Sequence, residues 1–71
     1  MQRVSVDSSN LASVGYDAER RVLEIEFHSG SVYRYRGVPE SVYRSLMSAD
    51  SHGQYFDREI KKAGYPYDHI K

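Results

Sequence analysis

The sequence predicts an α+β fold, in which a small antiparallel sheet of three to four strands forms a meander and two short helices follow it and pack on one face. Three observations support this prediction. Apolar and polar residues alternate through the first half of the chain, and short turn-forming stretches separate the alternating segments. The second half instead carries helix-start residues and apolar residues at helical spacing.

The length and composition of the chain allow one small hydrophobic core. Folding 71 residues could remove about 60% of the surface of the extended chain from water. Hydrophobic residues make up 39% of the sequence and charged residues 28%, which excludes a disordered chain and a membrane-spanning protein. We therefore expect a single globular domain over residues 1–71.

The first two predicted strands cover residues 4–6 and 11–17. In the first segment two valines flank a serine, which suits a short edge strand, and the turn-forming residues 8–10 end it. The second segment alternates as well, so its residues of even number are expected to share one face of the sheet.

The third predicted strand, residues 23–27, has the clearest pattern in the chain. Three apolar side chains alternate strictly with glutamates and a histidine, which is typical of a strand with one buried and one wet face. A four-residue hairpin loop at 17–20 would pair Val14 with Leu23 and set apolar side chains opposite each other.

The fourth predicted strand, residues 32–36, carries the central tyrosine pair. Its alternation places Tyr33 and Tyr35 on one face of the sheet and Arg34 and Arg36 on the other. Rings and guanidinium groups therefore cannot share one flat surface of this strand.

A three-residue loop at 29–31 is expected to set the register between the third and fourth strands. A two-residue loop would place apolar side chains opposite charged ones, whereas three residues keep both faces consistent. The tyrosines then lie on the face that the helices cover. Glutamates oppose arginines on the other face, where each pair adds about 0.2–1 kcal/mol. The predicted pairs are Phe27 with Tyr33, Ile25 with Tyr35, Glu26 with Arg34 and Glu24 with Arg36.

The first predicted helix runs from Pro39 to Ala49. Proline at the first helical position, followed by Glu40, is typical of a helix start. Val42 and Leu46 fall on one side of this helix, so we expect this apolar stripe to pack on the sheet.

The second predicted helix covers residues 52–63. Ser51 and Gln54 have the spacing of a capping box, and Gly64 supplies a stop signal at the end. The segment 65–67, Tyr-Pro-Tyr, is expected to be extended, because a residue before proline avoids the helical conformation. Three residues at helical spacing form the predicted inner face: Phe56, Ile60 and Ala63.

Charge and cysteine content exclude several function classes. Ten lysines and arginines balance ten aspartates and glutamates, so a nucleic-acid site would have to be a small patch. Cysteine is absent, which excludes disulfides, a thiol nucleophile and thiolate metal sites. The three histidines have no ligand spacing, and the sequence has no glycine-rich phosphate loop and no nucleophile motif. We expect no metal, no cofactor and no catalysis.

No apolar run is long enough for a signal-peptide core or a membrane-spanning helix. We therefore expect a cytoplasmic protein of bacterial type with no membrane partner. The sequence leaves its oligomeric state open.

Four segments of the chain together resemble the KTSC domain family: residues 8–17, 23–27, 30–39 and 49–56. The Tyr-x-Tyr motif, here Tyr33 and Tyr35, is a prominent feature of that family. The family is named after the C-terminus of certain lysyl-tRNA synthetases and also occurs as short stand-alone bacterial proteins. The resemblance implies a binding module without established activity, for which RNA is the suggested partner.

Six residues are the candidates for nucleic-acid binding. The tyrosines could stack on bases and the cations could hold phosphates. Each has a structural alternative: buried core for the rings, ion pairs with glutamates for the arginines, and stabilisation of a helix end for the lysines. The candidate residues are Tyr33, Arg34, Tyr35, Arg36, Lys61 and Lys62.

Two functions therefore remain open. The first is a small non-catalytic module that binds RNA. The alternative is a protein-interaction or accessory domain that uses exposed tyrosines and the sheet edge at residues 4–6, because seven tyrosines exceed what so small a core can bury.

The assignment of the two faces predicts how two neighbouring substitutions rank. Tyr35→Ala is expected to lower the free energy of unfolding by about 3–5 kcal/mol, as truncation of a buried ring does. Arg36→Ala is expected to cost less than about 1 kcal/mol, because exposed ion pairs contribute little. Thermal or denaturant unfolding of both variants tests this ranking, and the opposite order would mean that the faces are reversed.

Overall fold

A computed structural model describes residues 1–71. It contains one antiparallel sheet in which the spatial order of the five strands follows the chain. The predicted α+β class is confirmed, but the predicted three to four strands are wrong, because the sheet has five. The elements in chain order are β1 (Arg3–Ser5), β2 (Leu11–Asp17), β3 (Val22–Phe27), β4 (Val32–Arg36), α1 (Glu40–Ser48), α2 (His52–Phe56), the π-helix η1 (Asp57–Lys61) and β5 (Tyr67–His69).

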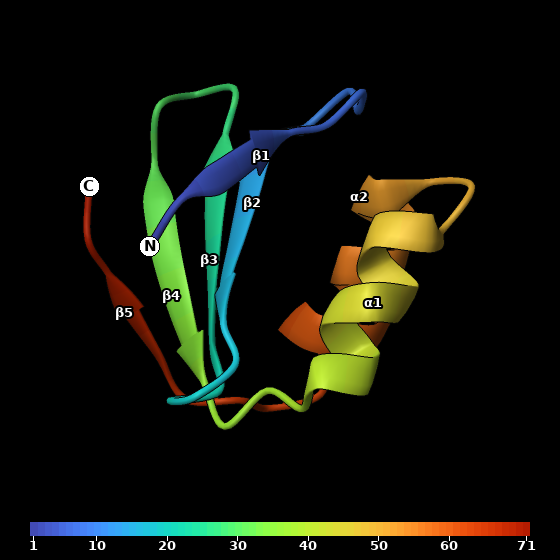
Figure 1. The fold of residues 1–71 in the computed structure, drawn as a ribbon. Helices are drawn as coiled ribbons and strands as arrows, with labels where there is room; N and C mark the ends of the chain where they lie inside the picture. Colours follow the sequence, from blue (N-terminus) through green and yellow to red (C-terminus); the bar gives the residue numbers. More distant parts are fainter.

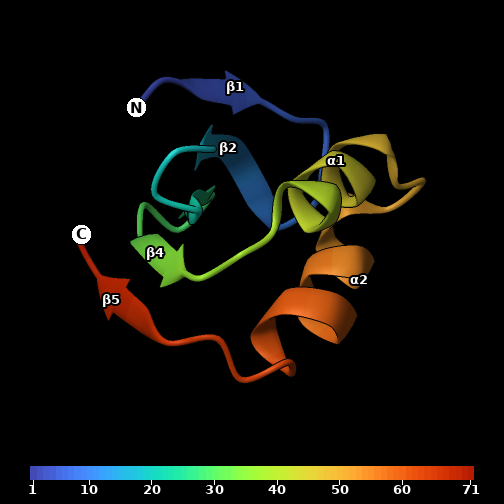
Figure 2. The same cartoon turned by 60° about the horizontal axis from the view of Figure 1, so that its bottom comes forward.

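The helices cover one face of the sheet, which we call the inner face. Figures 1 and 2 show α1 and α2 on the same side of the strands, with the N-terminus and C-terminus away from them. The other face, the outer face, carries no helix. No helix of this chain has the length and apolar character needed to cross a membrane.

The fifth strand, β5, extends the sheet beyond β4. Tyr67 pairs with Tyr35, and His69 pairs with Tyr33. Arg36 N–H also donates to the Pro66 carbonyl at 2.8 Å. The Tyr-Pro-Tyr segment predicts an extended conformation but not a partner, because three residues carry too little alternation to reveal a strand.

The hairpin between β2 and β3 differs from its prediction by two residues. Val14 pairs with Ile25 rather than with Leu23. The Asp17 carboxylate accepts the backbone N–H groups of Glu19 and Arg20, both at 3.1 Å, so Asp17 starts the turn while still pairing in the ladder. The loop therefore moves one residue along the chain, and the faces stay as predicted because the shift is even.

The hairpin between β3 and β4 is also shifted by two residues. Its three-residue loop covers 28–30 rather than 29–31, and Phe27 N–H donates to the Ser31 carbonyl at 2.9 Å. Gly30 takes the left-handed conformation, with φ of 96°. The predicted cross-strand pairs are therefore wrong, although both faces are correct. The observed pairs are Ile25 with Tyr33, Leu23 with Tyr35, Glu24 with Arg34 and Val22 with Arg36.

An irregularity at the start of β2 brings Leu11 into the core. Leu11 pairs with Phe27 and Ser13 pairs with Glu26, so β2 has one extra residue at this point. Such a bulge changes which side chains point inward. Leu11 is fully buried, whereas simple alternation through 11–17 predicts that it faces away from the core.

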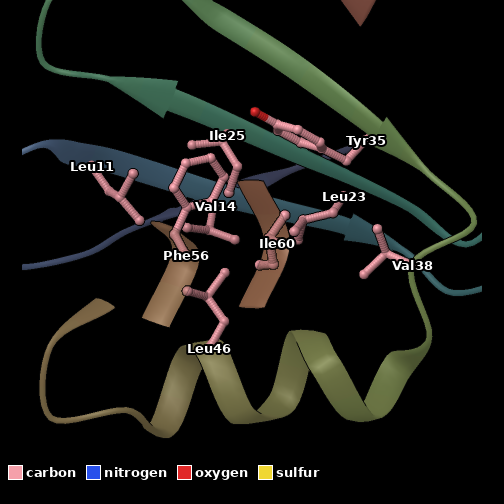
Figure 3. Packing of buried hydrophobic residues seen from close by; sticks show 9 residues of the cluster. All are labelled: Leu11, Val14, Leu23, Ile25, Tyr35, Val38, Leu46, Phe56 and Ile60. Carbon is pink, nitrogen blue, oxygen red and sulfur yellow. The ribbon is translucent and has the colours of Figure 1, made fainter. Parts of the chain in front are cut away.

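The core lies between the inner face and the helices. Figure 3 shows Leu46 of α1 and Phe56 of α2 pointing toward Val14 and Leu11 of β2. Full burial of an aliphatic or aromatic side chain contributes about 1.5–3 kcal/mol, so this cluster supplies most of the stability of the fold. Its members are Leu11, Val14, Leu23, Ile25, Tyr35, Val38, Leu46, Phe56 and Ile60.

A tyrosine of β2 fixes the entry to α1. The Tyr16 hydroxyl donates to the Val38 carbonyl at 2.6 Å. The ring of Tyr16 stacks on Tyr43 of α1, with centroids 4.8 Å apart and planes 8° apart. Pro39 is the N-cap rather than the first helical residue, so α1 starts at Glu40, one residue later than predicted.

The second helical segment begins as predicted and ends differently. The Ser51 side chain accepts the Gln54 N–H at 3.2 Å, which caps α2. From Asp57 onward the chain adopts a π-helical turn, and Lys62 N–H donates to the Asp57 carbonyl at 3.3 Å. The wider turn leaves Phe56 and Ile60 in the core but turns Ala63 to the surface. The predicted inner position of Ala63 is therefore wrong.

Candidate functional site

An aromatic cluster covers the inner face of β4 and β5. Tyr33 and Tyr35 project from β4, and Tyr67 and His69 project from β5 beside them. The Tyr33 ring lies parallel to the His69 ring, with centroids 4.4 Å apart and planes 4° apart. Tyr67 lies 5.7 Å from Tyr33 and 5.5 Å from Tyr35 between ring centroids. The cluster exists because antiparallel pairing sets these residues opposite each other on one face.

The rings range from buried to exposed. Tyr35 is 6% exposed, and its ring contacts Phe56 edge to face with centroids 5.6 Å apart. Tyr33 is half-buried, whereas Tyr67 is 57% exposed. Tyr35 therefore belongs to the core, and Tyr33 and Tyr67 carry the cluster out to the surface.

A groove runs between this cluster and η1. Its volume is about 520 Å³, within the range of small-ligand sites. Five of its lining residues are aromatic, and we call them the aromatic wall. The other five are polar or charged, and we call them the polar wall. A pocket that combines apolar rings with a few polar groups can orient a ligand. We call this pocket the aromatic groove, and its lining residues are Asn10, Phe27, Ser29, Ser31, Tyr33, Tyr35, Phe56, Asp57, Lys61 and Tyr67.

The polar wall depends on the π-helical turn. Asp57 begins η1 and Lys61 ends it, and both line the groove. The Lys61 ammonium lies 4.0 Å from the Asp57 carboxylate, and the Lys62 ammonium lies 3.3 Å from it. These side chains are about half exposed or more, so the ion pairs are open to solvent. Such exposed pairs are weak, and an anionic ligand could replace Asp57 as the partner of a lysine.

Asn10 lines the groove, and a glycine makes room for its side chain. A Cβ atom on Gly53 would collide with the Asn10 side-chain oxygen. Gly53 therefore allows the segment before β2 to pack against the start of α2. The Asn10 oxygen also accepts the Ser8 hydroxyl at 2.9 Å, which fixes its orientation at the rim.

The arginines of β4 lie on the outer face. Arg34 Nε donates to Glu24 at 2.7 Å, and Arg3 donates to the other oxygen of the same carboxylate at 2.8 Å. Glu24 is only 6% exposed, so two cations stabilise this buried charge. Arg36 pairs with Asp68 of β5 at 3.2 Å, whereas the predicted pairs were Glu24 with Arg36 and Glu26 with Arg34.

The structure separates the six candidate residues into two groups. Tyr33, Tyr35 and Lys61 line the aromatic groove. Lys62 pairs with Asp57 beside the groove, and Arg34 and Arg36 lie on the opposite face. The six candidates therefore do not form one patch. The alternation along β4 predicts this separation, because it places the tyrosines and the arginines on different faces.

Several groove residues are absent from the sequence-based candidates. Tyr67 is the main one, since its position depends on the missed strand β5. Asn10, Asp57 and Phe27 come from three other parts of the chain. The extended conformation predicted for the Tyr-Pro-Tyr segment is the one sequence feature that points to Tyr67. Nothing in the local sequence identifies Asn10, Asp57 or Phe27 as groove residues.

The histidines lie apart from one another and make local contacts. His28 Nε2 lies 2.8 Å from the Ser8 carbonyl, and His52 Nδ1 lies 2.8 Å from the Leu46 carbonyl. No group of three or more histidines and carboxylates is arranged to hold a metal ion.

A KTSC domain model matches residues 7–65 of the sequence. The chain belongs to the KTSC domain family. A crystal structure of a KTSC domain protein from Yersinia pestis superposes with a TM-score of 0.92 and 43% sequence identity, covering 99% of this chain and 97% of that chain.

Relatives of two sizes match the sequence. A protein of Stutzerimonas stutzeri described as uncharacterized is 48% identical over 67 residues, which cover 94% of both chains. A lysine–tRNA ligase of Nostoc punctiforme is 44% identical over 55 residues, which cover 78% of this chain and only 10% of the ligase. The KTSC domain thus occurs both in small proteins and as a small part of a synthetase.

Burial of Tyr35 predicts an alkaline loss of stability. Burial, together with the nearby Tyr33 and Tyr67 hydroxyls, raises the pKa of Tyr35 from 10.0 to about 12. In the unfolded chain the hydroxyl ionises near pH 10, so its contribution to stability is full below pH 10 and is lost between pH 10 and about 12. Urea unfolding at several alkaline pH values measures this loss.

Tyr35→Phe keeps the ring and is expected to reduce that alkaline loss. Tyr55→Phe removes a hydroxyl outside the groove and is the matched control, which should behave as the unmodified chain does. Equal alkaline curves for the two variants would show that Tyr35 ionises as an exposed tyrosine does.

Proposed function

We propose that this chain is a small non-catalytic module that binds single-stranded RNA, with the aromatic groove as the site for an unstacked base. The observation that carries the proposal is the groove itself. An exposed ring, Tyr67, and a lysine, Lys61, both line this space of about 520 Å³. Single-stranded nucleic acids are held by this combination of a stacking ring and a cation.

The aromatic wall suits a base better than it suits an aliphatic ligand. Tyr33 already stacks in parallel on the His69 ring, so a flat ring is accommodated on this surface. Tyr67 is 57% exposed and offers the free ring face. A base stacked on an aromatic side chain contributes about 1–3 kcal/mol.

The polar wall supplies groups for the rest of a nucleotide. Lys61 can hold a phosphate as a point charge. Asn10, Ser29 and Ser31 provide donors and acceptors at the rim, which suit the edge of a base or a ribose hydroxyl. A balanced net charge fits a site that engages one or two nucleotides rather than a long tract.

The lysine–tRNA ligase relatives support RNA as the partner. A ligase with that name acts on tRNA, and its matching segment is 44% identical to this chain over 55 residues. Such a partner is consistent with a cytoplasmic location. The absence of catalysis is part of the proposal.

The alternative function is a protein-interaction domain. Its supporting observation is the free edge of β1, where Met1 and Val4 are each 53% exposed. An extended peptide could add to this edge through backbone hydrogen bonds. The groove, which combines more binding features in one place, favours RNA.

Binding of a fluorescent single-stranded RNA of mixed sequence, followed by anisotropy, tests the proposal. Tyr67→Ala is expected to weaken binding about tenfold or more, because it removes a stacking ring. Lys61→Gln is expected to weaken binding and to reduce the salt dependence between about 50 and 200 mM. Lys62→Gln, next in the chain but not lining the groove, is the matched control and should change binding less.

Two results would contradict the RNA proposal. One is equal binding by the Tyr67→Ala variant and the unmodified chain. The other is an affinity that does not change with salt, since phosphate contacts release counterions. Recovery of a protein partner at high salt, lost on Val4→Asp, would instead favour the alternative function.

A further inference from the structure

A second depression lies on the outer face, on the opposite side of the sheet from the aromatic groove. Its volume is about 390 Å³. Three arginines line it: Arg34 and Arg36 from β4, and Arg20 from the loop between β2 and β3. Two carboxylates, Asp17 and Asp68, share its wall. Each of the three arginines has one carboxylate partner, and the partner of Arg34 is Glu24.

Each guanidinium group uses only one nitrogen for its ion pair. Arg36 contacts Asp68 through Nε at 3.2 Å, and Arg20 contacts Asp17 through Nη1 at 3.3 Å. Arg34 contacts Glu24 through Nε at 2.7 Å. Because a guanidinium carries five N–H donors, most donors of these three groups are left for a ligand. None of the three pairs is bidentate, the arrangement in which two N–H groups of one guanidinium donate to the two oxygens of one carboxylate.

Arg34 is held in place before any ligand arrives. Its partner Glu24 is buried and receives a second hydrogen bond from Arg3 at 2.8 Å. Arg36 stands two residues along the same strand, on the same face and about 6–7 Å away along the chain. Preorganised donors lower the entropy cost of binding, which favours an anion as the ligand of this surface.

Phosphate is the anion that fits these groups. The planar fork of arginine matches phosphate oxygens in pairs. A phosphate also offers more acceptor oxygens than a carboxylate, so it can bridge two of the three guanidinium groups. We propose that the outer-face depression binds phosphate groups through Arg20, Arg34 and Arg36, as a site separate from the aromatic groove.

Asp68 occupies part of this site in the free protein. Its side chain is 56% exposed and that of Arg36 is 54% exposed, so their pair is weak and an incoming phosphate can displace the carboxylate. Removing the negative charge of Asp68 should therefore strengthen phosphate binding rather than weaken it. A purely structural role of the pair predicts no such gain.

Isothermal titration calorimetry with inorganic tripolyphosphate at low salt tests the site. The double variant Arg20→Gln with Arg36→Gln is expected to lose roughly tenfold or more in affinity. Arg44→Gln with Arg58→Gln removes the same charge from exposed helical positions and should keep the affinity. Asp68→Asn is expected to raise the affinity several-fold. Thermal melts confirm that each variant is folded.

A second titration, with a short single-stranded RNA, identifies the source of the phosphate. A parallel loss of RNA affinity in the Arg20/Arg36 double variant would show that the site holds an RNA backbone. A loss confined to tripolyphosphate would show that it holds free phosphates. Both results support the site, and Tyr67→Ala should leave tripolyphosphate binding unchanged, so failure of the RNA proposal can be recognised separately.

Two outcomes would overturn the proposal. In one, the Arg20/Arg36 and Arg44/Arg58 double variants lose the same affinity, so that binding follows overall charge alone. In the other, tripolyphosphate binds neither the unmodified chain nor the Asp68→Asn variant.

Discussion

The alternation of side chains along β4 is the constraint on which the rest of the structure depends. Tyr35 is held in the core by Leu23, its partner across the ladder, and by the Phe56 ring. Because neighbouring side chains of a strand point to opposite faces, an inward Tyr35 places Arg34 on the outer face. There Arg34 donates a hydrogen bond to the buried Glu24 carboxylate. The helices cover only the inner face, so the aromatic groove forms at their border and the charged depression forms on the uncovered side. One five-residue strand thus gives the protein two surfaces of different chemistry.

Local patterns in the sequence predict the faces of the sheet but not its register. Strict alternation in β3 and β4 predicts correctly which side chains point inward and which point outward. A register shift of two residues leaves each side chain on the same face of the sheet. The register depends on turn details that alternation does not contain, such as the Asp17 carboxylate that accepts two backbone N–H groups. The strand β5 and the π-helical turn were missed for a related reason. Three residues carry no reliable period, and a π turn needs one more residue than the helical spacing that a sequence pattern assumes.

Only part of the candidate site could be predicted from the sequence. Tyr33, Tyr35 and Lys61 were candidates from residue type and the family motif, and they do meet in the groove. Tyr67 and Asp57 complete it from segments whose placement depends on tertiary contacts. The separation of rings from arginines means that the two surfaces can be altered independently. The proposed RNA stacking and the proposed phosphate binding can therefore be tested separately.

The most direct test of this account is an NMR titration of isotope-labelled protein with a short single-stranded RNA. The account predicts that the largest shifts fall on the ring resonances of Tyr33 and Tyr67 and on Lys61. Shifts confined to the β1 edge around Val4, with the Tyr33 and Tyr67 rings unchanged, would contradict it.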